Sequence, residues 1–342
     1  MTQASPRNFF VAALMSAVLP CFSQPVLMKM GTVAPDGSPW HQILQQMGQD
    51  WNKISAGKVT LRIYPGGVLG DEPDMIKKLR IGQLQAVALP GSGLSHLEPA
   101  VSCLQIPMMI QSYEELDYIR DRIAPRLEKL LDQKGYVVLN WGDAGWVHFF
   151  TKTPATKLDD IRKMKLFTMA GDADALELYQ SAGFRPVPLA TTDMLPALQT
   201  GLIDAFDVPP LLAMLNQWFG VANYMIDVKW APLVGATVVS RQTWERIAET
   251  IRPEMLEAAR GAGNRLRGEI RKMGDDAVAA MKKRGLNVIT PDAATRADWR
   301  RQAEDAYPKL RGRLVAAELF DEVKRLRDEF RARRESSTNG NE

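Results

Sequence analysis

The 342-residue chain has little of what most catalytic and metal sites are built from. It contains two cysteines and three histidines, so we expect neither a disulfide scaffold nor a histidine-based metal site. No G-x-S-x-G, Walker or G-x-G-x-x-G motif occurs, and no two histidines stand four residues apart. The sequence therefore gives no support to a catalytic centre, a cofactor or a metal ion.

An excess of one charge is also missing. Lysine and arginine total 43 and aspartate and glutamate total 40, which leaves a net charge of +3. Nucleic-acid-binding proteins usually concentrate positive charge on one face, and no segment shows this pattern, so we expect no nucleic-acid partner. Beyond the N-terminus, no segment reaches the roughly eighteen uninterrupted apolar residues of a membrane span.

The N-terminus is typical of an export signal. Arg7 precedes the apolar run 9–19, which is too short to cross a bilayer. Pro20 ends the run, and small residues precede a cleavage point after Ser23. We expect residues 1–23 to be a signal peptide and the mature protein to be soluble and periplasmic. The alternative is a buried N-terminal helix.

The hydrophobic pattern predicts a first α/β unit near the start of the mature chain. Alternating or wholly apolar strands are expected at 26–30, 59–64 and 84–89. Helices that begin near Pro39 and Asp71 separate them. This β-α-β-α-β order is typical of a layered α/β domain.

A second α/β unit is predicted at about 165–208. Its expected elements alternate in the same way, as strand 165–169, helix 172–182, strand 187–189, helix 192–200 and strand 203–206. At roughly 150 residues per domain, the chain length also favours two domains. We therefore expect two α/β lobes that face each other.

The last third of the sequence is mainly helical. A long helical region runs from 243 to 284 and is interrupted at Pro253. The Arg- and Glu-rich segment 322–334 has one apolar face and predicts a solvated helix, and 335–342 is expected to be a disordered tail.

Three segments, in order and at matching spacing, resemble the substrate-binding subunit of the TRAP (tripartite ATP-independent periplasmic) transporters of the dicarboxylate type. They are 64–71 (YPGGVLGD), 81–85 (IGQLQ) and 192–204 (TDMLPALQTGLID). The resemblance extends over about residues 26–310. It implies an α/β, two-lobed, periplasmic-binding-protein-like fold with a cleft between the lobes and a long bridging helix.

With this resemblance, the chain divides as follows. Lobe I is expected to comprise 24–144 plus about 233–272. Lobe II is expected to comprise 145–232 plus about 273–334. Such receptors close around a ligand in the cleft, and some members of the family dimerise, so the resemblance implies a monomer or a homodimer.

The positions that hold a ligand carboxylate in this family differ here. Phe167 and Val147 stand where the family commonly has arginines, and Val208 stands where it has a polar asparagine. Removing one partner of a buried ion pair costs about 3–5 kcal/mol, so an anionic ligand is disfavoured. An apolar ligand that buries on the order of 200 Å² gains about 5 kcal/mol instead.

We expect the ligand-binding residues to be mainly apolar or aromatic side chains around the cleft. They are Val33, Trp40, Leu89, Pro90, Gly91, Trp146, Val147, Phe167, Asp193, Phe206 and Val208.

The function implied by the resemblance is an extracytoplasmic receptor that delivers a largely apolar or neutral solute to the TRAP membrane permease subunits. It needs no cofactor and no metal. One alternative is a periplasmic interaction protein that presents a lipid or aromatic ligand to a sensor or envelope partner. A catalytic alternative would need His148 in the cleft with Asp193 or Asp207 orienting it, and we expect no enzyme.

Overall fold

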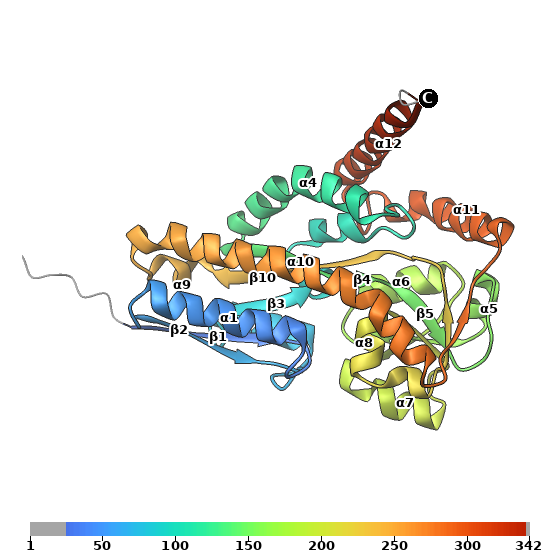
Figure 1. Cartoon of the computed structure of the whole chain (residues 1–342), viewed down its shortest axis with the longest axis horizontal. Coiled ribbons are helices and arrows are strands. Elements are labelled where there is room, and N and C mark those ends of the chain that lie inside the picture. Colours follow the sequence, from blue (N-terminus) through green and yellow to red (C-terminus); the bar gives the residue numbers. More distant parts are fainter. Residues whose placement is uncertain (1–24, 340–342) are drawn as a thin grey trace, which may run out of the picture.

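Two β-sheets, each covered by helices, form two lobes (Figure 1). The computed structural model describes residues 25–339, so the expected signal peptide at 1–23 lies outside the described residues. The first sheet has five strands in the order β2-β1-β3-β10-β4, and the second has six in the order β11-β9-β5-β8-β6-β7. The predicted α/β class and two-lobed architecture are therefore confirmed.

The five-stranded sheet is the centre of lobe I. Strand β1 pairs in parallel with β2 and β3, and β10 runs antiparallel between β3 and β4. The strands are β1 (Val26–Thr32), β2 (Val59–Tyr64), β3 (Ala86–Pro90), β4 (Tyr136–Trp146) and β10 (Pro232–Ser240). The helices around this sheet are α1 (Pro39–Ile54), α2 (Glu72–Arg80), α3 (Gly91–Leu94), η1 (Pro99–Gln105), α4 (Tyr113–Gln133), α9 (Arg241–Glu245) and η4 (Glu249–Ile251).

The local sequence explains where helix α1 begins and which face it buries. The Ser38 hydroxyl accepts a hydrogen bond from the His41 amide (3.3 Å), and Pro39 occupies the first turn, where no intrahelical donor is needed. Met47 and Trp51, four residues apart, are both fully buried against lobe I. The predicted start of this helix is confirmed.

The six-stranded sheet is the centre of lobe II. Its strands are β5 (His148–Thr151), β6 (Lys165–Met169), β7 (Arg185–Leu189), β8 (Ala205–Val208), β9 (Tyr224–Ile226) and β11 (Asn287–Ile289). The helices are α5 (Leu158–Arg162), α6 (Ala173–Ser181), η2 (Thr191–Asp193), α7 (Met194–Thr200), α8 (Pro210–Leu215), η3 (Trp218–Gly220) and α11 (Ala293–Leu310). Strands β5 and β9 and helix α5 were not predicted, because elements of three to five residues are too short to show a periodicity.

The segment from β4 to β5 and the segment from β9 to β10 cross between the lobes, and one long helix also joins them. Strand β4 continues into β5 through Val147, whose amide donates to the Ala231 carbonyl (2.8 Å) on the returning segment. Helix α10 (Arg252–Lys282, 31 residues) packs on α1 and β4 in lobe I and on α8 in lobe II (Figure 1). This is the predicted bridging helix. Pro253 lies in its first turn, so the break precedes the helix and does not divide it.

The C-terminal helices return to both lobes. Helix α11 buries Trp299 in the lobe II core, whereas α12 (Ala317–Asn339) packs on α4 and η1 (Figure 1). Phe320 and Val323 belong to the lobe I core, so residues 317–334 lie with lobe I, where we had expected lobe II. The helix also continues to Asn339, into the tail that was expected to be disordered. Within 25–339, no helix is long and apolar enough to cross a membrane.

Candidate ligand-binding site

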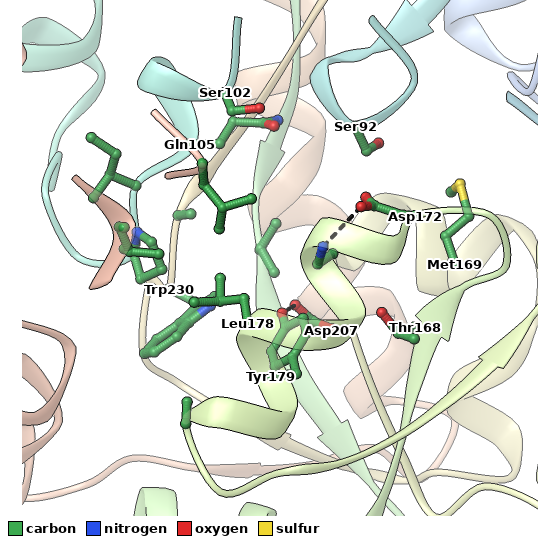
Figure 2. Close-up of a pocket in the computed structure, with 18 of the residues that line it drawn as sticks. Ser92, Ser102, Gln105, Thr168, Met169, Asp172, Leu178, Tyr179, Asp207 and Trp230 are labelled. Atoms are coloured by element: carbon green, nitrogen blue, oxygen red, sulfur yellow. Dashed lines mark hydrogen bonds between the residues drawn. The ribbon is translucent and has the colours of Figure 1, made fainter. Parts of the chain in front are cut away.

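A cavity of about 540 Å³ lies between the lobes (Figure 2). Lobe I contributes residues of α3 and η1, lobe II contributes residues of β6, α6 and β8, and α11 covers one side. Its volume falls within the range that is usual for small-molecule sites. Contributions from both lobes place this cavity where closure of the lobes would enclose a ligand.

One polar group on the lobe II wall is the carboxyl of Asp207. Strand β8 buries Phe206, which stacks on Phe150 at 5.1 Å between ring centroids, so the alternation of the strand turns Asp207 to the cavity face. The Tyr179 hydroxyl of α6 donates a hydrogen bond to Asp207 Oδ2 (2.9 Å; Figure 2). Burial raises the pKa of Asp207 to about 7, although the Tyr179 hydrogen bond opposes this shift.

A second carboxyl, Asp172, lies at the start of α6. Its Oδ1 accepts a hydrogen bond from the Ala175 amide (2.9 Å), so it serves as the N-cap of the helix. Figure 2 shows Ser92 of lobe I on the opposite side of the cavity. The Ser92 hydroxyl donates to Glu72 Oε2 (3.0 Å), and burial, together with the nearby charge of Asp172, raises the pKa of Glu72 to about 8. Carboxyl groups thus approach this edge of the cleft from both lobes.

Positive charge at the cavity comes from one arginine among the described lining residues. Arg162, on α5, donates from Nε to the Ala182 carbonyl (2.9 Å) and from Nη1 to the Asp159 carboxylate and the Gln302 side chain. It therefore has a neighbouring carboxylate of lobe II as its ion-pair partner. This leaves no cation in the described lining without an anionic partner.

The remaining wall is largely apolar. Val147 and Phe167, which were expected at the site, both line this cavity. They are accompanied by Leu178, Phe184 and Trp230. These side chains offer an apolar and partly aromatic surface to the body of a ligand.

Four other expected residues line a smaller pocket of about 110 Å³. They are Val33, Trp40, Leu89 and Pro90. The wall of this smaller pocket is almost wholly apolar. Leu233 borders both this pocket and the larger cavity. The structure therefore places six of the eleven expected residues in two separate pockets and does not gather them at one surface.

Five expected residues border neither pocket. Phe206 and Val208 are buried in lobe II, Trp146 packs on Tyr113 with 5.3 Å between ring centroids, Gly91 is buried beside Gln105, and Asp193 is exposed in η2.

Sequence reasoning missed most polar residues of the cavity. The polar lining residues absent from the expected ligand-binding set are Ser92, Ser95, His96, Ser102, Gln105, Arg162, Thr168, Asp172, Tyr179, Gln302 and Asp207, of which Asp207 was named only in the catalytic alternative. The buried neighbours of Asp207 in β8 could have signalled that it faces the other way, but its pairing with Tyr179 depends on how α6 packs on the sheet.

His148, the histidine of the catalytic alternative, is a buried structural residue. Its Nδ1 lies 3.2 Å from the Ile226 carbonyl oxygen, and burial lowers its pKa. It borders neither pocket, Asp193 lies on the exposed surface, and the hydrogen-bonding side chain at Asp207 is Tyr179. The structure does not bring together the residues that this alternative requires.

An ion-pair network fixes α10 to lobe I beside the smaller pocket. Arg271 of α10 donates to Asp143 Oδ2 (2.7 Å) and to both carboxylate oxygens of Asp117 (2.7 Å each). Arg120 adds a second contact to Asp143 (3.3 Å), and the Trp40 indole donates to the Asp143 carbonyl (3.3 Å). The bridging helix is thus tied to lobe I close to the cleft.

Comparison with known proteins gives consistent matches. A family model described as bacterial extracellular solute-binding protein, family 7, matches residues 30–312. The C4-dicarboxylate-binding periplasmic protein DctP of Rhodobacter capsulatus is 22% identical over 312 residues, which cover 90% of this chain and 92% of the relative.

Solved structures share the fold. The sugar acid binding protein DctPAm from Advenella mimigardefordensis in complex with galactonate aligns with a TM-score of 0.83 and 20% identity, covering 90% of this chain and 99% of that one. A TRAP periplasmic solute binding protein from Xanthobacter autotrophicus with bound β-D-galacturonate aligns with a TM-score of 0.81 and 20% identity, covering 88% and 99%.

Proposed function

Because the chain belongs to family 7 of the bacterial extracellular solute-binding proteins, we propose that its interlobe cavity binds a largely apolar or neutral small molecule for delivery to a TRAP membrane permease. The family assignment itself makes the protein a periplasmic TRAP solute receptor and not an enzyme. The ligand class and the permease partner are the proposed part.

The ligand class is supported by the charges of the cavity wall. Arg162 is hydrogen-bonded to Asp159 and Gln302, and Val147 and Phe167 present only hydrocarbon. A carboxylate that entered this cavity would lose its hydration and face Asp207 and Asp172. An uncharged apolar body gains about 25 cal/mol for each Å² that it buries.

Delivery to a permease requires that the ligand change the lobe arrangement. A ligand shifts an open–closed equilibrium only by the difference in its affinity for the two states. A ligand in this cavity contacts α3 and η1 from lobe I and α6 and β8 from lobe II at the same time. Since those contacts are complete only when the lobes are together, binding favours the closed form that a membrane partner would recognise.

The experiment is a thermal-shift screen of the purified mature protein. Its panel pairs neutral and apolar solutes with simple dicarboxylates and sugar acids of similar size. We expect a solute of the first class, at one hundred times its Kd, to stabilise the protein by about 2.7 kcal/mol. Tight binding of a sugar acid or dicarboxylate, without any response to apolar solutes, would overturn the ligand class and leave the receptor role intact.

A further inference from the structure

We infer that the polar end of the ligand is a protonated amine, held at the carboxyl group of Asp207 on the lobe II wall, with Asp172 as a second carboxyl group in the lining of the same cavity. This inference rests on the proposed receptor function and narrows its ligand class. It follows from the charges at the cavity. The arginine there has a carboxylate partner in the protein, whereas the two aspartates form no ion pair within the described residues.

Neither carboxyl group forms an ion pair within the described part of the chain. Asp207 Oδ2 accepts one hydrogen bond, from the Tyr179 hydroxyl (2.9 Å), and Asp172 Oδ1 accepts one, from the Ala175 amide (2.9 Å). Each carboxylate has about four acceptor positions, so acceptor capacity remains on both. An ammonium group carries three donors and no acceptor, which is the complement of this wall.

The other titratable groups at the cavity do not offset these carboxyls. Arg162 is held by Asp159 and Gln302, and Tyr179 keeps its proton because burial and the charge of Asp207 raise its pKa well above the usual value. His96 borders the cavity from lobe I, and its Nε2 is buried without a hydrogen-bond partner in the described structure.

The aromatic wall suits the body of such an amine. Phe167, Phe184 and Trp230 line the same cavity as Asp207. Aromatic faces attract a nearby cation, and they bury the hydrocarbon of an arylalkyl or alkyl chain. An amine with an apolar body therefore matches both parts of the wall, whereas the carboxylate of a sugar acid would lie in a cavity lined by two aspartates.

The raised pKa of Asp207 is consistent with this assignment. Burial favours the neutral carboxyl, because no cation within the described residues stabilises its charged form. A bound ammonium supplies that cation and lowers the pKa, so amine binding near pH 7 should release a proton. An alcohol of the same shape should not.

The test uses three probes that share one body, namely phenethylamine, 2-phenylethanol and 3-phenylpropionate, together with the heptyl series of the same three groups. Binding is measured by titration calorimetry at pH 8, where Asp207 is mostly ionised. We expect at least one amine to bind at least tenfold more tightly than its alcohol, and the carboxylates to bind most weakly. At pH 7, titrations in two buffers of different ionisation enthalpy should report proton release for the amine alone.

Variants identify the site. Asp207→Asn keeps an acceptor for Tyr179 and should weaken amine binding at least tenfold, by a larger factor than it weakens alcohol binding. Asp172→Asn keeps a helix cap and should weaken amine binding less. Asp305→Asn removes a carboxylate from the exposed surface of α11 and serves as the matched control, for which we expect no change. The buffer comparison uses the unaltered protein and is informative even if a variant fails to fold.

Three results would overturn the inference. Equal binding of amine and alcohol would do so and would leave the apolar receptor in place. Binding of no amine would do so as well. Tightest binding of a carboxylate, abolished by Arg162→Gln, would overturn both the amine and the apolar ligand class, while the family's receptor role would remain.

Discussion

Asp143 is buried and Asp207 is partly buried beside the cavity, and the protein compensates their charges differently. Asp143, on β4, lies against Arg120 and Arg271, and its side chain is only 1% exposed. Asp207, on β8, has the Tyr179 hydroxyl as its hydrogen-bonding side chain and no ion pair within the described residues. Removing one partner of a charge pair inside the protein destabilises the fold, whereas a charge left unpaired beside a cavity costs stability and is available to a ligand.

The largest expected effect comes from neutralising each aspartate in turn. Asp143→Asn should destabilise the protein by about 3 kcal/mol, because it leaves the buried guanidinium of Arg120 and the partly buried one of Arg271 without that carboxylate. Asp207→Asn should change stability by less than about 1 kcal/mol and should be stabilising at pH 8, where it removes a poorly solvated charge. Urea unfolding of both variants measures the difference. Similar losses in the two variants would remove the distinction between a structural and a ligand-binding aspartate.

The next effect is on the pH dependence of stability. Glu72, in α2, has its pKa raised from 4.5 to about 8 in the folded protein. The folded state therefore holds this proton where the unfolded chain has lost it, so stability falls as the pH rises from about 4.5 to 8. One pKa unit corresponds to about 1.4 kcal/mol, so between pH 6 and pH 9 the loss from this group is about 2–3 kcal/mol.

Glu72→Gln should remove this part of the pH dependence. Urea unfolding of the unaltered protein and the variant at pH 6, 7.5 and 9 measures it. Asp207, whose pKa is raised to about 7, adds a smaller slope in the same direction that the variant should retain. A variant whose stability falls as steeply as that of the unaltered protein would show that Glu72 is ionised throughout this range.

A smaller effect is expected when a guanidinium is placed on the apolar wall. Phe167 is 8% exposed and lines the cavity. Phe167→Arg should raise the affinity for succinate by about tenfold, which corresponds to about 1.4 kcal/mol, and should weaken binding of apolar solutes. Leu202→Arg, at a surface position that is 50% exposed, is the control. Unchanged binding of both ligand classes would mean that Phe167 does not contact the ligand.

The smallest effect is expected at Arg162. Its ion pair with Asp159 joins side chains that are 25% and 61% exposed, and such pairs contribute about 0–1 kcal/mol. Arg162→Gln should leave binding of apolar solutes within about twofold in a calorimetric titration. A large loss would place the guanidinium in contact with the ligand and would reverse our assignment of its charge.

Much of the fold could be predicted because its signals are local. Strand β6 has the predicted bounds Lys165–Met169, and α1 begins at Pro39, as predicted. The packing of α12 on lobe I could not be predicted, because its apolar stripe shows that it packs but does not identify the surface it packs against. Tertiary contact, not periodicity, decides that choice.

Less of the site could be predicted, because most of its residues come together only through tertiary contacts. Val147 and Phe167 were found because motif positions identify them, and both line the cavity. Asp207 and Tyr179 are 28 residues apart in the sequence and meet only when α6 packs on the second sheet. No spacing rule reports such a pair, and the sequence therefore predicted the apolar wall but not the acidic one.

The most direct test of the account is the mass and composition of the solute that co-purifies with the protein from its native host, measured by native mass spectrometry. The account predicts a small molecule with an apolar body and no carboxylate, carrying an amine if the assignment of Asp207 is right. A bound sugar acid or dicarboxylate would contradict the central claim that the charges of this cavity exclude an acid.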